Sequence, residues 1–269
     1  MKKLATALVS AAAIMTMSTT AFAAENPAEV FDRVMEKNNT IQSAEIQSGV
    51  HSVILAKDVI PDGQMKVDMA MHAEMDMQDT TDLKYLAQVA SSILGQDSYS
   101  QVFYTDGYYY VDANGVKLKY PMPLEQIISS VQTGVNTSNM ESSYMKGISL
   151  NEVNGKRVLA YEANPKKLNK NVKEALGTVM NTLGTDVNLD MNIQEMKGAY
   201  VLDDNDYIIY MRNYIVYNME VLDQPMTCIT LMETEVQTPG EPVVVTLPST
   251  DGYEDLIGLY DGVIESEVE

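Results

Sequence analysis

The sequence has little cysteine, little histidine and no tryptophan, and these shortages exclude whole classes of protein. Cys228 is the only cysteine among 269 residues, so the chain cannot form an internal disulfide. Its two histidines, His51 and His72, leave few ways to build a Ser-His-Asp triad. The sequence also contains no Gly-x-Ser-x-Gly, no His-Glu-x-x-His and no phosphate-binding glycine loop. We therefore expect a protein that is not an enzyme and has no cofactor.

Basic residues are also scarce. Lysine and arginine together number 18 against 38 aspartates and glutamates, which gives a formal net charge of −20 at pH 7. Nucleic-acid backbones and anionic membrane surfaces both repel a protein with this charge. We expect no nucleic-acid partner.

Long apolar runs are missing except near the N-terminus. Lys2 and Lys3 precede the apolar stretch Leu4–Met17, and Ala21-Phe22-Ala23 offers the small-x-small pattern of a signal peptidase site. The apolar stretch is shorter than the roughly 20 residues of a spanning helix, which disfavours a permanent N-terminal anchor. Residues 1–23 are predicted to be a signal peptide, so we expect a secreted chain without stable membrane insertion after cleavage.

Beyond the signal segment, the composition predicts a single domain and a tail. Residues 24–250 have the length of one domain with its own core. Residues 251–269 carry seven acidic side chains and no basic one, so we expect an acidic C-terminal tail.

Hydrophobic periodicity predicts four helices. Val30, Phe31, Val34 and Met35 follow the three-and-four spacing of a helix that begins near Pro27. The same reasoning predicts helices over Asp82–Leu94, Pro123–Val131 and Pro165–Leu183.

Period-two patterns and turn dipeptides predict long strands between these helices. The dipeptides Asp62-Gly63, Asp106-Gly107, Asn114-Gly115 and Asn154-Gly155 are typical of tight hairpins, and a further turn is expected at Asp203–Asp206. The order of helices and strands favours an α+β fold with a large antiparallel sheet. Strands are predicted over 45–59, 64–78, 98–105, 108–112, 116–120, 148–153, 157–161, 187–194, 207–221 and 226–236.

One predicted strand, 64–78, carries apolar residues at seven alternating positions. A strand places them all on one face, whereas a helix would scatter them around its surface. These positions are Met65, Val67, Met69, Met71, Ala73, Met75 and Met77. Methionine is unbranched and polarizable, so a surface rich in it adapts to irregular apolar guests.

Three hypotheses follow from the methionines. The first is a binding protein in which an apolar pocket holds a lipid or other hydrophobic small molecule. The second is an extracellular interaction or sensor domain whose methionines fill a packed core. The third is a copper protein that uses methionine and histidine, although His72 would point away from the methionines of its own strand. For the first hypothesis we expect ligand contacts from Met65, Val67, Met69, Met71, Met75, Met77, Met191 and Met211.

The segment Tyr104–Tyr120, which reads YTDGYYYVDANGVKLKY, resembles a segment of secreted proteins of unknown function from Gram-positive bacteria. Those proteins look like distant relatives of the LolA and LppX/LprG lipoprotein carriers. The resemblance implies a curved half-barrel sheet with helices over its concave face, acyl chains held between them, and a location on the cell-envelope side of a Gram-positive-type bacterium. The chain departs from the lipoproteins because Cys228 lies far from the cleavage site and cannot carry their lipid anchor. The oligomeric state stays open.

Overall fold

The computed structural model describes residues 25–56, 60, 62–79, 83–123, 140–170, 191–221 and 224–256. The predicted signal peptide, the tail beyond residue 256, the strand residues 187–190 and the helix predicted over Pro123–Val131 (apart from Pro123 itself) lie outside these residues. The same holds for residues 171–183 of the last predicted helix. Its first part, residues 165–170, is helical as predicted.

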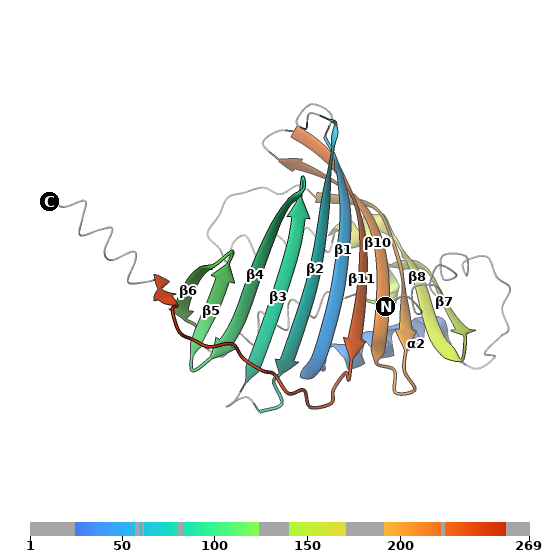
Figure 1. The fold of residues 1–269 in the computed structure, drawn as a ribbon. Coiled ribbons are helices and arrows are strands. Elements are labelled where there is room, and N and C mark those ends of the chain that lie inside the picture. Colours follow the sequence, from blue (N-terminus) through green and yellow to red (C-terminus); the bar gives the residue numbers. More distant parts are fainter. Residues whose placement is uncertain are drawn as a thin grey trace. The chain divides into compact units, whose positions relative to one another are not determined.

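Strands dominate the described part of the chain (Figure 1). The two helices with defined ends are α2 (Pro27–Asn38) and the short 3-10 helix η2 (Ser142–Tyr144). The strands are β1 (Ser43–Leu55), β2 (Gln64–Asp76), β3 (Lys84–Ile93), β4 (Gln96–Thr105), β5 (Tyr108–Ala113), β6 (Val116–Pro121), β7 (Met145–Val153), β8 (Lys156–Ala163), β9 (Met191–Leu202), β10 (Ile208–Val221), β11 (Gln224–Gln237) and β12 (Glu254–Asp255).

The strands belong to one twelve-stranded sheet with the order β12-β6-β5-β4-β3-β2-β1-β11-β10-β9-β8-β7. Strands β2 to β6 and β7 to β10 pair antiparallel with their neighbours, whereas β12 pairs parallel with β6. The predicted fold class, α+β with a large antiparallel sheet, is confirmed. None of the described helices is long and apolar enough to cross a membrane.

Contacts within the chain define two compact units. Unit 1 consists of the described residues within Met1–Lys37, Ser52–Gln64 and Asn139–Glu233. Unit 2 consists of those within Asn38–His51, Met65–Ser138 and Thr234–Glu269.

Helix α2 provides the centre of the core in unit 1. The side chain of Asn26 caps the helix by accepting a hydrogen bond from the amide of Ala28 at 3.1 Å, and Pro27 occupies the first turn. The apolar stripe predicted for this helix is buried against β8, β9 and β10. Phe31 lies among the rings of Tyr161 and Tyr200, with centroid distances of 5.8 and 6.2 Å.

The helix predicted over Asp82–Leu94 is wrong, because Lys84–Ile93 forms strand β3. This strand pairs along its length with β2 on one side and β4 on the other, so its backbone groups are satisfied by the sheet. Leu94 and Gly95 have φ values of 54° and 77°, which is the geometry of a two-residue hairpin turn and not of a helix end. Pairing on both edges overrides a weak helical pattern in the side chains.

The chain after β11 crosses unit 2 to reach β6 (Figure 1). The amide of Val243 donates to the Ser43 hydroxyl at 3.0 Å. Further along, Val245 and Tyr253 are buried together with Phe103 of β4. The first residues of the predicted acidic tail therefore pack against the sheet.

Candidate functional site

Strands β2 to β6 of unit 2 bring their small and branched apolar residues into line on one face. Directly opposed residues of antiparallel strands share a face, and the register here runs without a bulge. One row across all five strands consists of Ala73, Ala87, Val102, Val111 and Leu118. Because each row lies two residues from the next, successive rows are about 7 Å apart.

The rows on either side complete this surface. One row consists of Met75, Tyr85, Tyr104, Tyr109 and Tyr120. The row on the other side consists of Met71, Val89, Ser100, Ala113 and Val116. We define the uncharged face as the odd-numbered residues of β2, β3 and β5 and the even-numbered residues of β4 and β6. Within these five strands, all of whose residues are described, no residue of that face carries a charge.

The opposite face of the same strands is charged and partly covered. Its apolar patch, formed by Leu86, Phe103 and Tyr110, packs against the C-terminal segment that carries Val245 and Tyr253. The charged residues there are Lys66, Asp68, Glu74, Asp76, Lys84, Asp97, Asp112, Lys117 and Lys119. The two faces therefore differ in charge.

The uncharged face continues from a buried core to exposed surface. At one end Met75 is 1% exposed and packs with Met77 and Tyr104. At the other end Met69 is 39% exposed and Val116 is 60% exposed. Between these ends, the side chains of Met71, Val89, Val102, Val111 and Leu118 are half-buried. A continuous apolar surface of this kind is typical of a binding site.

The structure unites the predicted ligand residues of β2 on this face. Met65, Val67, Met69, Met71 and Met75 share it, and Met77 follows directly in the core cluster at its buried end. The strand and its predicted alternation are confirmed.

The two remaining predicted ligand residues belong to unit 1. Met211 packs against the α2 core, and Met191 begins β9 opposite Met219. The sequence-based prediction missed Val102, Val111 and Leu118. The signal for them was the alternation within residues 98–120, where each of these side chains lies two positions from a tyrosine or another apolar residue.

The tyrosine row adds neutral hydroxyl groups to the face. Burial raises the pKa of Tyr109 to about 12, with smaller contributions from Tyr85 and Tyr120, whose pKa values burial also raises. The Tyr104 hydroxyl donates to the carbonyl of Met122 at 3.3 Å. The phenols of Tyr85, Tyr109 and Tyr120 therefore stay protonated around neutral pH, and they add no charge to the face.

The histidines do not join the methionines. His72 lies on the charged face, where its Nε2 is 3.1 Å from Glu45, and His51 Nδ1 is 2.7 Å from Asp68. Asp68, the partner of His51, is four residues from His72 on β2, about 13 Å along the strand, so the two histidines do not form a shared site. Among the described residues, no group of three histidine, cysteine or acidic side chains is arranged to hold a metal ion.

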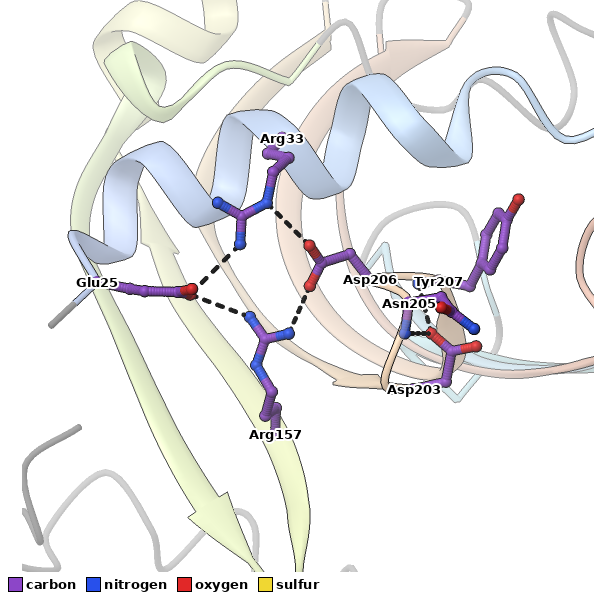
Figure 2. Close-up of polar contacts among 7 residues, drawn as sticks. All are labelled: Glu25, Arg33, Arg157, Asp203, Asn205, Asp206 and Tyr207. Carbon is purple, nitrogen blue, oxygen red and sulfur yellow. Dashed lines mark hydrogen bonds and ion pairs between the residues drawn. The ribbon is translucent and has the colours of Figure 1, made fainter.

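The acidic turns use their oxygens locally. Asp203 Oδ1 accepts hydrogen bonds from the amides of Asn205 and Tyr207, each at 2.8 Å (Figure 2). Asp112 Oδ1 accepts from the amide of Gly115 at 2.9 Å. These carboxylates stabilise the predicted turns.

A closed ring of ion pairs joins the start of α2 to the turn between β9 and β10 (Figure 2). Arg33 and Arg157 each contact both Glu25 and Asp206, at 3.3 Å to Glu25 and at 2.8 and 2.5 Å to Asp206. Burial by itself would raise the pKa of Asp206, but hydrogen bonds from the two guanidinium groups outweigh it and lower that pKa. The ring is balanced in charge, so it stabilises the fold without creating an anion or cation site.

We predict that Asp206→Asn lowers the free energy of unfolding at pH 7 by about 1–2 kcal/mol, because two charge-assisted hydrogen bonds are weakened. Asn tolerates the φ of 68° at this position, so the backbone is preserved. Since the folded-state pKa of Asp206 lies below its unfolded value, its contribution is present above about pH 4 and is lost as pH falls through the folded pKa. Urea denaturation between pH 7 and pH 2.5 measures both effects.

The control for this prediction is Asp204→Asn, an exposed residue of the same turn. It is expected to leave stability within about 0.5 kcal/mol of the wild type at every pH. If the two variants lose equal stability at pH 7, the ion-pair ring does not stabilise unit 1.

Cys228 is buried. Its thiol lies 3.7 Å from the sulfur of Met219. Burial raises the pKa of the thiol, which disfavours the reactive thiolate. Cys228 is therefore part of the packing of β10 and β11.

Comparison with known proteins identifies the family. Residues 26–240 match the model described as a family of unknown function (DUF6612), and the chain belongs to that family. This confirms the part of the resemblance that assigned the chain to proteins of unknown function. No curated protein matches.

Two solved structures are similar at low TM-scores. One is a beta-barrel-like protein of the domain of unknown function DUF1849 from Brucella abortus, 12% identical over 74% of this chain and 100% of that chain, with a TM-score of 0.24. The other is the ywiB protein from Bacillus subtilis, 11% identical over 76% of this chain and 99% of that chain, with a TM-score of 0.21. Neither likeness carries an argument about function.

Proposed function

We propose that this member of the DUF6612 family is a secreted, non-enzymatic protein that binds a lipid or another hydrophobic small molecule on the uncharged face of unit 2. The observation that supports it is the continuity of an apolar, charge-free surface from the core at Met75 to the exposed side chain of Met69. The predicted signal peptide supports secretion, and the resemblance of residues 104–120 to carriers of the LolA and LppX/LprG type points to the same class of ligand.

Binding of this kind requires only a modest apolar contact area. Covering about 300 Å² of apolar surface contributes on the order of 7 kcal/mol, at about 25 cal/mol per Å². The loss of ligand freedom offsets several kcal/mol of this gain. Flexible methionines at the half-buried positions reduce the demand for an exact shape match.

We predict that Met71→Asp weakens binding of the apolar fluorescent probe N-phenyl-1-naphthylamine at least tenfold, because a carboxylate on this face must lose hydration whenever the probe covers it. The matched control is Ala70→Asp, which places the same carboxylate on the opposite, exposed face of the adjacent residue. We expect that variant to bind the probe within a factor of two of the wild type. Fluorescence titration measures both, and circular dichroism confirms that each variant is folded.

The two possible failures have different meanings. Absence of probe binding by the wild-type chain contradicts the proposed function. Equal binding by both variants contradicts the assignment of the ligand to the uncharged face.

A protein partner is the second candidate function, and the exposed side chains of Ile93 and Val116 favour it. In that case a packed interaction domain would use the same face against another protein, and the wild-type chain would not retain the probe. Copper binding gains nothing from the structure, because His72 and the methionines lie on opposite faces of β2.

A further inference from the structure

The uncharged face also indicates which charge and which polar group a hydrophobic ligand would have. We infer that this face selects an electrically neutral lipid with a hydroxyl group at its polar end, such as a diacylglycerol, and discriminates against anionic and cationic lipids. This inference rests on the proposed function and names the ligand class of the same site.

The first argument is the segregation of charge. The chain carries a net charge of −20, yet none of the residues that β2 to β6 place on this face is charged. A phosphate or carboxylate covered there would lose hydration without gaining a cation. An ammonium headgroup would lose hydration without gaining a carboxylate.

The lysines of these strands are turned away from the face. Lys117 lies over the ring of Tyr253 at 5.3 Å, and Lys119 lies over the ring of Tyr108 at 5.2 Å. Both rings belong to the charged side of the sheet, where Tyr253 packs with Phe103. The two cations of β6 therefore stabilise the opposite surface and are not positioned to receive an anionic headgroup.

The second argument is the tyrosine row. Tyr109 faces Tyr120 across the β5–β6 pair with ring centroids 5.5 Å apart, and Tyr85 lies in the same row on β3. Among the described residues, the hydroxyls of these three tyrosines have no hydrogen-bond partner. A phenol both donates and accepts, so this row suits a neutral group that does the same, which is an alcohol.

The third argument is the position of the row. The tyrosines lie next to the buried end at Met75, and the half-buried apolar rows extend from them toward the exposed end. A lipid whose polar group lies beside the tyrosines would have its acyl chains along the apolar rows. Burial of that group raises the cost of any charge on it.

The test uses the full secreted chain, delipidated and then incubated with an equimolar mixture of three lipids. The lipids are dioleoylglycerol, dioleoyl phosphatidic acid and dioleoyl trimethylammonium propane, which share acyl chains and differ in headgroup charge. After gel filtration, solvent extraction and mass spectrometry, we expect dioleoylglycerol to be enriched at least tenfold over each charged lipid.

A single hydroxyl deletion tests the role of the tyrosine row. Tyr109→Phe is expected to reduce retention of dioleoylglycerol about three- to tenfold. Tyr108→Phe, the adjacent residue on the charged face, is the matched control and is expected to leave that retention unchanged. Equal losses in the two variants would overturn the role of the row.

The outcomes separate this inference from the proposed function. Retention of phosphatidic acid or of the cationic lipid at the level of dioleoylglycerol overturns the inference and leaves hydrophobic binding intact. Retention of none of the three lipids, together with no probe binding, overturns both.

Discussion

Gly198→Ala is expected to lower the free energy of unfolding by about 3 kcal/mol or more, because the added methyl group has no space. Gly198 lies in β9 between Tyr161 of β8 and Asn213 of β10. A Cβ at this position would come within 2.8 Å of the carbonyl oxygen of Arg212 and of the Tyr161 hydroxyl, and nearer still to Asn213 Oδ1. The backbone oxygen cannot rotate away, so the strands themselves would have to move.

The same substitution also disturbs a buried hydrogen bond. The Tyr161 hydroxyl donates to Asn213 Oδ1 at 2.7 Å, and both residues are buried. Burial raises the pKa of Tyr161 well above its ordinary value, so the phenol remains a donor. Separating this pair removes the Tyr161 hydroxyl from the buried Asn213 Oδ1, and losing a buried hydrogen bond of this kind costs about 1–3 kcal/mol.

Urea denaturation followed by circular dichroism measures the effect. Gly147→Ala in β7 is the matched control, because a Cβ there meets no atom within 4 Å. That variant is expected to stay within about 0.5 kcal/mol of the wild type. A loss of less than 1 kcal/mol in Gly198→Ala would mean that β8, β9 and β10 are not packed as the structure has them.

Local sequence signals predicted most of the strands. The dipeptides at 106–107, 114–115 and 154–155 all have positive φ at both residues, as a two-residue hairpin requires, and they fix the hairpins β4–β5, β5–β6 and β7–β8. These signals need no information from distant parts of the chain. That is why the predicted and observed strand ends differ there by only a few residues.

Strand β3 shows that local sequence signals can be insufficient to choose between a helix and a strand. Its apolar residues fit both helical and extended spacing, and the extended conformation is selected by β2 and β4, which offer hydrogen bonds on both edges. Gly95 was compatible with a helix end and with a hairpin turn. Only the pairing of neighbouring strands decides between them, and pairing is not encoded within the segment itself.

The candidate site was also predictable from local signals only in part. The methionine face of β2 was predictable because one strand contains the whole pattern. The row from Ala73 through Val102, Val111 and Leu118 required the register of four strand pairs, which the sequence does not state. Gly198 gave no signal at all, since the need for glycine arises from Tyr161 and Asn213, 37 and 15 positions away along the chain.

The placement of charge depends both on alternation within a strand and on the register between strands. Lys117 and Lys119 alternate with Leu118 and Tyr120 in the sequence. Because successive residues of a strand point to opposite faces, the lysines and the apolar groups lie on opposite sides of β6. The register of the strand pairs then aligns the uncharged residues of β2 to β6, and together these residues form a surface without charge. A local alternation thus becomes a property of a whole face only after the strands are aligned.

Phe31→Ala is the second substitution with a large expected effect, about 3–5 kcal/mol. Phe31 is fully buried, and it is the aromatic residue through which α2 contacts Tyr161 and Tyr200. Removing the ring leaves a cavity that the surrounding strands can fill only in part, and it removes two aromatic contacts. Thermal and urea denaturation of the full chain measure the loss.

The control is Glu36→Ala on the exposed side of the same helix, where the change is expected to stay within about 0.5 kcal/mol. The pair separates burial from helix propensity, because both variants place alanine, the best helix former, in α2. If α2 is held to β8–β10 by its apolar stripe, only Phe31→Ala destabilises the protein. Equal stability of the two variants would show that the helix contributes little to the core of unit 1, and the packing assigned to Val30, Val34 and Met35 would then also be wrong.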